Sequence, residues 1–316
     1  MDISRLDPEH LDEVEPAWLA LCAHLDALGT RMGPLRPPDE LWRRRRERYA
    51  TWLERDPGAA VLVAREEGRL LGYAMTELKP GWDVRVTSDP VAELQTLSVM
   101  PEARGRGVGA ALLRAVDDRL HDHGVRELTV GVSTANEAAL RLYAREGYRP
   151  FMSTWWARPV PEPAPSDVPV EVVDPDDVDE LRPLWRALCD HHDAVGPGYL
   201  PERRDPDEAF TRQRDHLTGD EAFVLRAPGG YLHAYVGGGF DVWDTGKVGA
   251  VEALVVDEQG RGRGTGAALL NEAFRVMHAR RADAVELDGL AGNTGAAAFD
   301  GRMGLEREFE TLFKRL

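Results

Sequence analysis

Apolar and polar residues alternate along this chain in a series of helices and strands that occurs twice. In the first series, apolar side chains recur at helical spacing in two segments, and runs rich in apolar and β-branched residues follow at strand spacing. The order is two helices, three strands, a helix, a strand, a helix and a last pair of strands. The predicted bounds are, in this order, 8–28, 39–53, 60–64, 70–78, 92–99, 110–123, 127–132, 136–146 and, for the last pair, around 148 and 153–157.

The same series returns in the second half of the chain. Trp18 and Cys22 match Trp185 and Cys189 at an offset of 167 residues. Residues 60–63 and 72–73 match 222–225 and 234–235 at an offset of 162, and the offset is 157 from the centre of each half onward. We attribute the falling offset to two short deletions in connecting regions of the second copy. The chain is therefore predicted to be a duplicated domain.

A proline-rich segment separates the two copies. Prolines alternate with other residues between 159 and 169, and such a sequence favours an extended, semi-rigid linker. The predicted organisation is an N-terminal domain at 1–158, a linker at 159–169 and a C-terminal domain at 170–316. A fragment that ends near Pro161 is expected to fold by itself.

Each half contains a glycine-rich turn between an apolar strand and a helix. The first is Arg104-Gly105-Arg106-Gly107-Val108-Gly109, and the second is Arg261-Gly262-Arg263-Gly264-Thr265-Gly266. Backbone N–H groups at a helix N-terminus lack partners, the helix dipole favours an anion there, and glycines let a pyrophosphate approach closely. The spacing differs from that of dinucleotide folds and P-loops. Two copies in equivalent places therefore predict a site for a phosphorylated ligand, present twice.

These turns resemble a motif of the GNAT superfamily of acetyl-CoA-dependent N-acetyltransferases. Both satisfy its Arg-x-x-Gly-x-Gly pattern, and Asn136, Tyr143 and Gly147 resemble a second segment of the family. The resemblance covers almost the whole chain, once per half. It implies two tandem α/β (α+β) folds, each a mixed, largely antiparallel sheet flanked by helices on both faces.

The resemblance also implies an acetyl-CoA site in each half. The pantetheine is expected to bond along the strand edge before each loop, with the loop around the pyrophosphate. In the first half these residues are Leu97, Ser98, Val99, Arg104, Gly105, Arg106, Gly107, Val108, Gly109 and Asn136. In the second half they are Leu254, Val255, Val256, Arg261, Gly262, Arg263, Gly264, Thr265, Gly266 and Asn293.

Catalytic residues are predicted in the first half. Tyr143 matches the family tyrosine that protonates the departing thiolate, and a phenol is a suitable acid for that task. Glu93, on the central strand, is the candidate base, acting directly or through water, and it is alternatively a substrate anchor. The second half has Asp300 where the first has Tyr143, and an aspartate ionised at pH 7 cannot protonate a thiolate. Glu252 occupies its central strand.

Composition narrows the class without identifying the acceptor. The chain has 316 residues, 43% of them hydrophobic and 30% charged, with a net charge of −16. This acidity argues against a nucleic-acid partner and is compatible with a cationic amine acceptor. No apolar run approaches the roughly 20 residues of a membrane span. A cytoplasmic protein, monomer or homodimer, without a metal site is expected, with Cys22 and Cys189 as core residues.

The predicted function is transfer of an acetyl group from acetyl-CoA to a primary amine of a small molecule or peptide in a ternary complex. The N-terminal half is expected to be catalytic, because its motif set is complete. One alternative is an enzyme similar to the mycothiol-synthase group of tandem GNAT proteins, with an active C-terminal half. The other is a non-catalytic acyl-CoA sensor.

Overall fold

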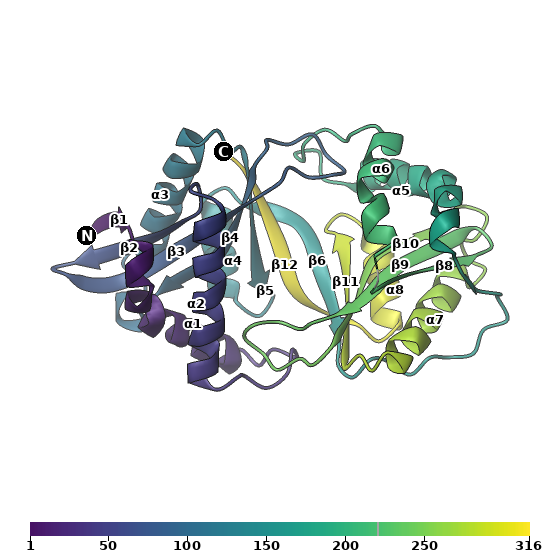
Figure 1. Cartoon of the computed structure of the whole chain (residues 1–316), viewed down its shortest axis with the longest axis horizontal. Coiled ribbons are helices and arrows are strands. Elements are labelled where there is room, and N and C mark those ends of the chain that lie inside the picture. The colour runs from purple at the N-terminus through teal and green to yellow at the C-terminus, as the bar shows by residue number, and fades with distance from the viewer. Residues whose placement is uncertain (220) are drawn as a thin grey trace.

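One mixed sheet runs through the molecule from end to end (Figure 1). The structure is a computed structural model that describes residues 1–219 and 221–316. In this part of the chain the sheet has 12 strands in the order β1-β2-β3-β4-β5-β12-β6-β11-β10-β9-β8-β7. The pairs β4–β5 and β10–β11 are parallel, and the others are antiparallel. The predicted α/β class, with two repeated units, is therefore confirmed.

The two halves contain matching elements. The first consists of β1 (Asp2–Arg5), the 3₁₀ helix η1 (Pro8–Val14), α1 (Glu15–Ala27), α2 (Pro38–Arg55), β2 (Ala60–Glu66), β3 (Arg69–Lys79), β4 (Val91–Val99), η2 (Pro101–Ala103), α3 (Val108–Asp122), β5 (Glu127–Ser133), α4 (Glu137–Arg145) and β6 (Arg149–Ala157). The second consists of β7 (Glu171–Val172), η3 (Pro175–Leu181), α5 (Arg182–Val195), α6 (Pro206–Leu217), β8 (Ala222–Ala227), β9 (Gly230–Gly237), β10 (Val248–Val256), α7 (Thr265–Ala279), β11 (Ala284–Leu290), α8 (Thr294–Arg302) and β12 (Glu306–Arg315).

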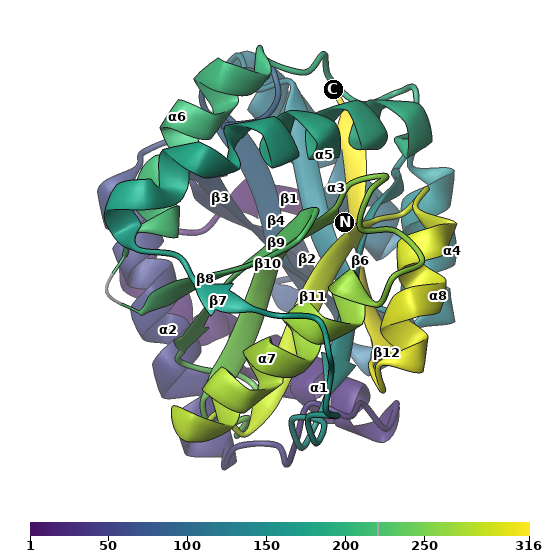
Figure 2. The ribbon, with the colours of Figure 1, turned by 90° about the vertical axis from the view of Figure 1, so that its right-hand side faces the viewer.

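Helices cover both faces of the sheet in each half. In the first half, α1 and α2 pack on one face, and α3 and α4 pack on the other. In the second half, α5 and α6 lie across the sheet from α7, as the end-on view shows (Figure 2). Alternate strand residues point to the two faces, so each strand contributes to two separate cores. Cys22 and Cys189 are buried and free in the cores under α1 and α5, as predicted.

The last strands of the two halves are exchanged. The sequence predicts a final pair of strands within the first half, around Tyr148 and at 153–157, but the structure has one strand there, β6. Strand β12 from the end of the chain lies between β5 and β6, and β6 in turn pairs with β11 (Figure 1). Neighbouring strands therefore come from different halves at three successive positions, and the sheet has no seam between them.

The exchange continues in two long loops. The β3–β4 loop, residues 80–90, reaches the second half, where the backbone of Val86 bonds to Glu202. The β9–β10 loop, residues 238–247, reaches the first half, where Trp243 bridges to Leu35. The linker is docked as well, because Ala164 N–H donates to Asn271 of α7 at 2.7 Å and Val160 is buried.

The strand ladders correct two details of the predicted repeat. Tyr73 pairs with Ser98 on the central strand of the first half, and Tyr231 pairs with Val255 on that of the second half. Ser98 and Val255 are 157 positions apart, so they are counterparts. The counterpart of Tyr73 is therefore Tyr231 and not Tyr235. The deletions also shorten the ends of elements, in addition to the connecting regions that the sequence predicts. Helix α6 has 12 residues where α2 has 18, and β9 has 8 where β3 has 11.

Candidate active site

The two glycine-rich loops have the same backbone conformation. Gly107 and Gly264 cap α3 and α7 with φ of 81° and 83°, in the left-handed region that glycine adopts without strain. Neither helix has a side-chain cap at its N-terminus. The first-turn N–H groups are therefore available to an anion in both halves, which is the arrangement that suits a pyrophosphate.

A third glycine in each loop lets the next helix approach. A Cβ on Gly266 would lie 3.4 Å from Val256 and 3.5 Å from Phe299 of α8, and a Cβ on Gly109 would lie 3.1 Å from Leu142 of α4. The loops differ in charge. Arg106 donates to Glu66 at 2.6 Å, whereas Arg263 takes part in no ion pair among the residues that the structure describes. The second loop therefore keeps one more arginine for an anionic ligand.

The strand before each loop diverges from its parallel neighbour. Strand β4 pairs with β5 at two positions, the last at Glu93, and β10 pairs with β11 at four positions, the last at Val251. Beyond these points the backbone of 97–99 and of 254–256 pairs only with the strand on its other side. The splayed edges are where the resemblance predicts the pantetheine, and their geometry fits an added strand.

A β-bulge lies next to each splayed edge. One extra residue interrupts each ladder, Gln95 between β3 and β4 and Glu252 between β9 and β10. The two residues are 157 positions apart, so they are counterparts in the repeat. Bulges re-aim a side chain and are common beside active sites. The bulge residue is a carboxylate only in the second half.

A cavity of about 1420 Å³ connects the second loop to this bulge. At one end it is lined by the loop residues Arg261, Gly262, Gly264, Thr265 and Gly266, and Asn293 lies nearby. At the other end the wall contains Tyr235, Glu252 and Asp288. A ligand at the loop and a ligand at the bulge can therefore share one continuous space.

Three carboxyl groups gather around the bulge end. Burial, followed by the nearby charges of Asp288 and Glu252, raises the pKa of Glu286 to about 7. Glu252 and Asp288 are exposed at the cavity, yet the surrounding protein desolvates both carboxyl groups and raises their pKa values, and Asp288 raises that of Glu252 further. The Asp288 carboxylate accepts from Thr154 at 2.6 Å. None of the three forms an ion pair with Lys or Arg within the described ranges. A cationic ligand would relieve this concentration of negative charge.

In the first half, the carboxylates near the corresponding bulge are neutralised by basic side chains. Gln95 donates to Glu77 at 2.8 Å, and Glu77 is paired with Arg55 at 3.0 Å. Glu93, the predicted base, forms an ion pair with Lys79. Arg55 comes from the last turn of α2, which has no equivalent in the shorter α6. The carboxylates of this half therefore already have cationic partners.

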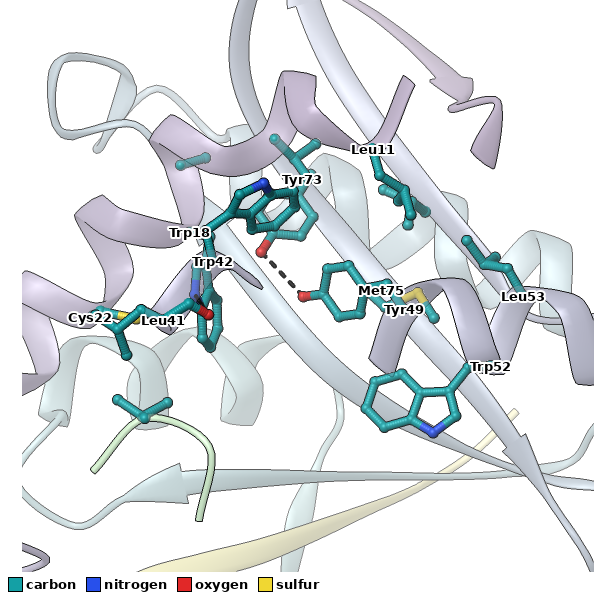
Figure 3. Close-up of a cluster of buried hydrophobic side chains, with 14 of the residues drawn as sticks. Leu11, Trp18, Cys22, Leu41, Trp42, Tyr49, Trp52, Leu53, Tyr73 and Met75 are labelled. Atoms are coloured by element: carbon teal, nitrogen blue, oxygen red, sulfur yellow. Dashed lines mark hydrogen bonds between the residues drawn. The ribbon is translucent and has the colours of Figure 1, made fainter. Parts of the chain in front are cut away.

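Side chains from α2 also occupy the first half's equivalent space. The Tyr49 hydroxyl lies 3.1 Å from the Tyr73 hydroxyl (Figure 3). It also lies 2.5 Å from Thr96 Oγ1, and all three side chains are buried. The counterparts of Thr96 and Tyr73 are Ala253 and Tyr231, which line the cavity of the second half. The helix α6 ends at Leu217, the position of Tyr49 counted from the helix starts, so this face lacks the tyrosine hydroxyl that covers it in the first half.

Tyr143 and Asp300 occupy the same position in different surroundings. Tyr143 is 5% exposed and packs edge-on against Tyr148, and burial raises the pKa of its phenol. Asp300 is 2% exposed, lines the cavity, and has one buried oxygen without a hydrogen-bond partner among the described residues. Burial raises the pKa of Asp300 to about 7. Asp300 is therefore protonated in part near pH 7, and the expected full ionisation at this pH is not required by its surroundings.

Sequence reasoning missed Glu286 and Asp288. They are two residues apart on β11, so they share one face of the sheet, and their counterparts in the first half are Thr129 and Gly131. A comparison of the two repeats would have shown this gain of two carboxylates. By contrast, Asn136 and Asn293 were correctly placed at helix starts, where each side chain caps a backbone N–H at 3.1 Å.

Comparison with known proteins identifies the class. The model of the acetyltransferase (GNAT) family matches this chain twice, over residues 27–148 and 185–305. These segments cover more than half of the chain, so the protein belongs to the GNAT family, as its motifs predict. Members of this family use acetyl-CoA as co-substrate, and both loops fit its pyrophosphate.

Curated relatives match over part of their length. An uncharacterized N-acetyltransferase of Mycobacterium tuberculosis is 36% identical over 102 residues, which are 32% of this chain and 60% of the relative. A mycothiol acetyltransferase of Thermobispora bispora is 34% identical over 134 residues, which are 42% of this chain and 42% of the relative. The chain thus spans less than two thirds of the length of these relatives.

Solved structures share the tandem fold. A GCN5-related N-acetyltransferase from Sphaerobacter thermophilus has a TM-score of 0.63 at 20% identity, covering 99% of this chain and 95% of that chain. A tandem GNAT protein from the clavulanic acid biosynthesis pathway has a TM-score of 0.51 at 19% identity, covering 99% and 98%. At these identities the likeness is one of fold.

Two further structural features concern metal ions and membranes. In residues 1–219 and 221–316, no group of three or more His, Cys, Asp and Glu side chains is placed to hold a metal ion. Within the same ranges, no helix has the length and apolar character required to cross a membrane.

Proposed function

We propose that the C-terminal half transfers the acetyl group of acetyl-CoA to a primary amine of a small molecule. The observation that supports this most is the cavity that joins the loop at 261–266 to the carboxyl groups around Glu252. The loop suits a pyrophosphate, and the carboxyl groups suit a cationic amine. The splayed edge at 254–256 lies between them.

The chain's own residues supply the proton transfers. Bound acetyl-CoA supplies an activated acyl carbon with a thiolate leaving group. A protonated amine first gives one proton to Glu252. The neutral nitrogen then attacks the acyl carbon, so that a C–N bond forms and the C–S bond breaks, and the second nitrogen proton leaves to water. Asp300, protonated in part near its pKa of about 7, gives a proton to the thiolate.

Catalysis by the N-terminal half is the second candidate. Its motif set is complete, and the assignment of Tyr143 and Glu93 to catalysis stays a prediction. Under that alternative, Tyr143→Phe would lower kcat and Asp300→Asn would change it little. Under our proposal the two effects are reversed. Tyr143→Phe is a mild probe because the ring still packs and only the hydroxyl is lost.

The relatives suggest which amines to try first. They include mycothiol acetyltransferases and an L-2,4-diaminobutyric acid acetyltransferase of Nocardia farcinica, which is 33% identical over 96 residues, covering 30% of this chain and 46% of the relative. Those names describe the relatives. An acceptor panel for this protein should contain amino acids, diamines, aminosugars and peptides with free N-termini.

The experiment is a measurement of thiol release from acetyl-CoA with each amine of the panel. We expect amine-dependent release that is lost in Gly264→Val and retained in Gly107→Val, since each change distorts one loop at a glycine with positive φ. Loss in Gly107→Val alone would place the reaction in the N-terminal half. Acetyl-CoA binding without release for any amine would instead support the sensor alternative.

A further inference from the structure

The first half contributes part of the wall of the second half's cavity. Phe151 and Met152 come from the exchanged strand β6, and Val84 and Arg85 come from the β3–β4 loop. His191, His192 and Arg203, from α5 and the segment that follows it, line the same cavity. The acceptor site is therefore built from both halves of the chain.

Arg85 is held in a fixed position. Its Nη1 donates to the Pro201 carbonyl at 2.7 Å, and the backbones of Arg85 and Arg203 form a β-bridge. Backbone bonds on either side, Val86 N–H to Glu202 and Arg204 N–H to Val84, complete the attachment. An arginine that is fixed in this way loses little conformational entropy when it binds a ligand.

Arg85 lacks the acidic partners that its neighbour has. Arg203 is paired with Asp193 at 2.7 Å and with Asp190 at 3.6 Å. Arg85 forms no ion pair within residues 1–219 and 221–316, although it is only partly exposed. Burial lowers the pKa of its guanidinium and lowers that of His192 to about 4. At neutral pH Arg85 is thus a cation on the cavity wall with no ion pair of its own among the described residues, and His192 is neutral. The acidic charge close to Arg85, Asp193, is paired with Arg203.

We propose that Arg85 binds an anionic group, a carboxylate or a phosphate, on the acceptor whose amine lies at Glu252. The acceptor class is then a molecule with an amine at one end and an anion at the other. This inference rests on the proposed function of the C-terminal half. It explains why a cation from the other half is built into the cavity that Glu252 and Asp288 also line.

The test compares acceptors that differ only in the anion. Linear ω-amino acids of four to six carbons, their amides, and aminoalkyl phosphates of similar length are assayed with wild type, Arg85→Gln and Arg85→Lys. Arg212→Gln, on the exposed side of α6, is the control for the same change in net charge. Binding of each compound is also measured by calorimetry, independently of turnover.

We expect the acids or the phosphates to have a kcat/KM about 10–100-fold above that of the amides, because a hydrogen bond to a charged group is worth that much. Arg85→Gln should abolish this preference, Arg85→Lys should keep part of it, and the amides should be unaffected. The class of compound, acid or phosphate, that loses more kcat/KM in Arg85→Gln identifies the anion that Arg85 binds. Equal values for anionic and amide acceptors in wild type, or equal losses in Arg85→Gln, would overturn the proposal.

Calorimetry separates this proposal from the proposed function. Tighter binding of the anionic compounds that depends on Arg85, without any acetylation, would retain the anion contact and refute the transfer reaction. Acetylation of amides and acids alike would retain the transfer and refute the contact.

Discussion

Asp300 and Tyr143 show how one position of a repeat acquires different chemistry from its surroundings. Their identities are plain in the sequence, but the ionisation of Asp300 depends on burial beside a cavity that residues from distant parts of the chain enclose. The pKa of about 7 makes Asp300 a proton donor near neutral pH. It also makes the carboxyl group a source of pH-dependent stability.

We predict that Asp300→Asn is stabilising relative to wild type at pH 8 and has a much smaller effect at pH 5. The carboxyl has a raised pKa in the folded protein, so its favourable contribution is present in acid and is lost as pH rises from about 4 to about 7. Asparagine does not titrate. Between pH 5 and pH 8 the difference in unfolding free energy should grow by about 3 kcal/mol, because most of the change lies below the folded-state pKa of about 7.

Urea denaturation at the two pH values measures this effect. Asp122→Asn, at an exposed position of α3, is the control for removal of a surface carboxylate. A stability difference that is the same at pH 5 and pH 8 would contradict the raised pKa of Asp300.

The residues that the sequence predicted best are those whose role is local. The loop glycines and Asn136, at the start of a predicted helix, depend on neighbours within one or two turns. Arg45 belongs to a basic run of α2 in which Arg43 and Arg44 form such local ion pairs, with Glu47 and Glu40. It is instead buried over the Trp18 ring, because Asp241 from the other half lies 3.6 Å away. Glu93 likewise has a partner, Lys79, that only the β3–β4 ladder brings beside it.

At the scale of elements, the length of one helix decides which half is open. The second half of α2 places Tyr49 and Trp52 over the sheet. Counted from the helix starts, α6 has Leu217 at the position of Tyr49 and ends there, so Trp52 has no counterpart. The sequence showed that residues are deleted between the copies. Only the structure showed that the deletion falls within the helix α6. The order of strands and helices was predictable because the hydrophobic period of each segment is a local property of the sequence. The pairing partner of β6 was not predictable, because it comes from the other half of the chain.

We predict that a large side chain at Ala253 closes the acceptor space. Ala253 lines the cavity at the place where Thr96 contacts Tyr49 in the other half. Ala253→Phe should therefore raise the KM for the amine at least tenfold, while the affinity for acetyl-CoA at the loop stays near its wild-type value. Steady-state kinetics with both substrates varied gives the two constants. A lost affinity for acetyl-CoA with an unchanged acceptor KM would show that this part of the cavity holds the pantetheine.

At the scale of the whole molecule, the exchanged strands make the halves interdependent. The sequence predicts that a fragment ending near Pro161 folds by itself, since each half carries a full set of elements. In the intact chain, β5 and β6 of that fragment are separated by β12. We now expect fragments 1–158 and 159–316 to expose apolar surface when separate and to form a native complex when mixed.

Dye binding and circular dichroism measure the state of each fragment, and size-exclusion chromatography measures complex formation. A 1–158 fragment that is monomeric, cooperative in unfolding and free of exposed apolar surface would support the independent domain that the sequence predicts. It would show that β6 can take the place of β12 beside β5.

Two loops of equal geometry predict two acetyl-CoA sites of unequal affinity. Arg106 is paired with Glu66, whereas Arg263 has no acidic partner among the residues that the structure describes. Arg263 is therefore available to the pyrophosphate, and the C-terminal site should be the tighter one. Calorimetric titration of wild type should fit two sites. Gly264→Val should remove the tighter site and Gly107→Val the weaker. A stoichiometry of one that Gly264→Val leaves unchanged would exclude the second site.

The most direct test of the account is kcat for Glu252→Gln beside that of its matched control, Glu93→Gln. Both changes remove one carboxylate from a central strand, but Glu252 lies at the bulge in the open cavity and Glu93 is paired with Lys79. If the C-terminal half is the active site, Glu252→Gln lowers kcat by about 10²–10⁴-fold, as loss of a general base does, and Glu93→Gln leaves kcat near the wild-type value. A silent Glu252→Gln together with a strongly impaired Glu93→Gln would contradict the account and place the reaction in the N-terminal half.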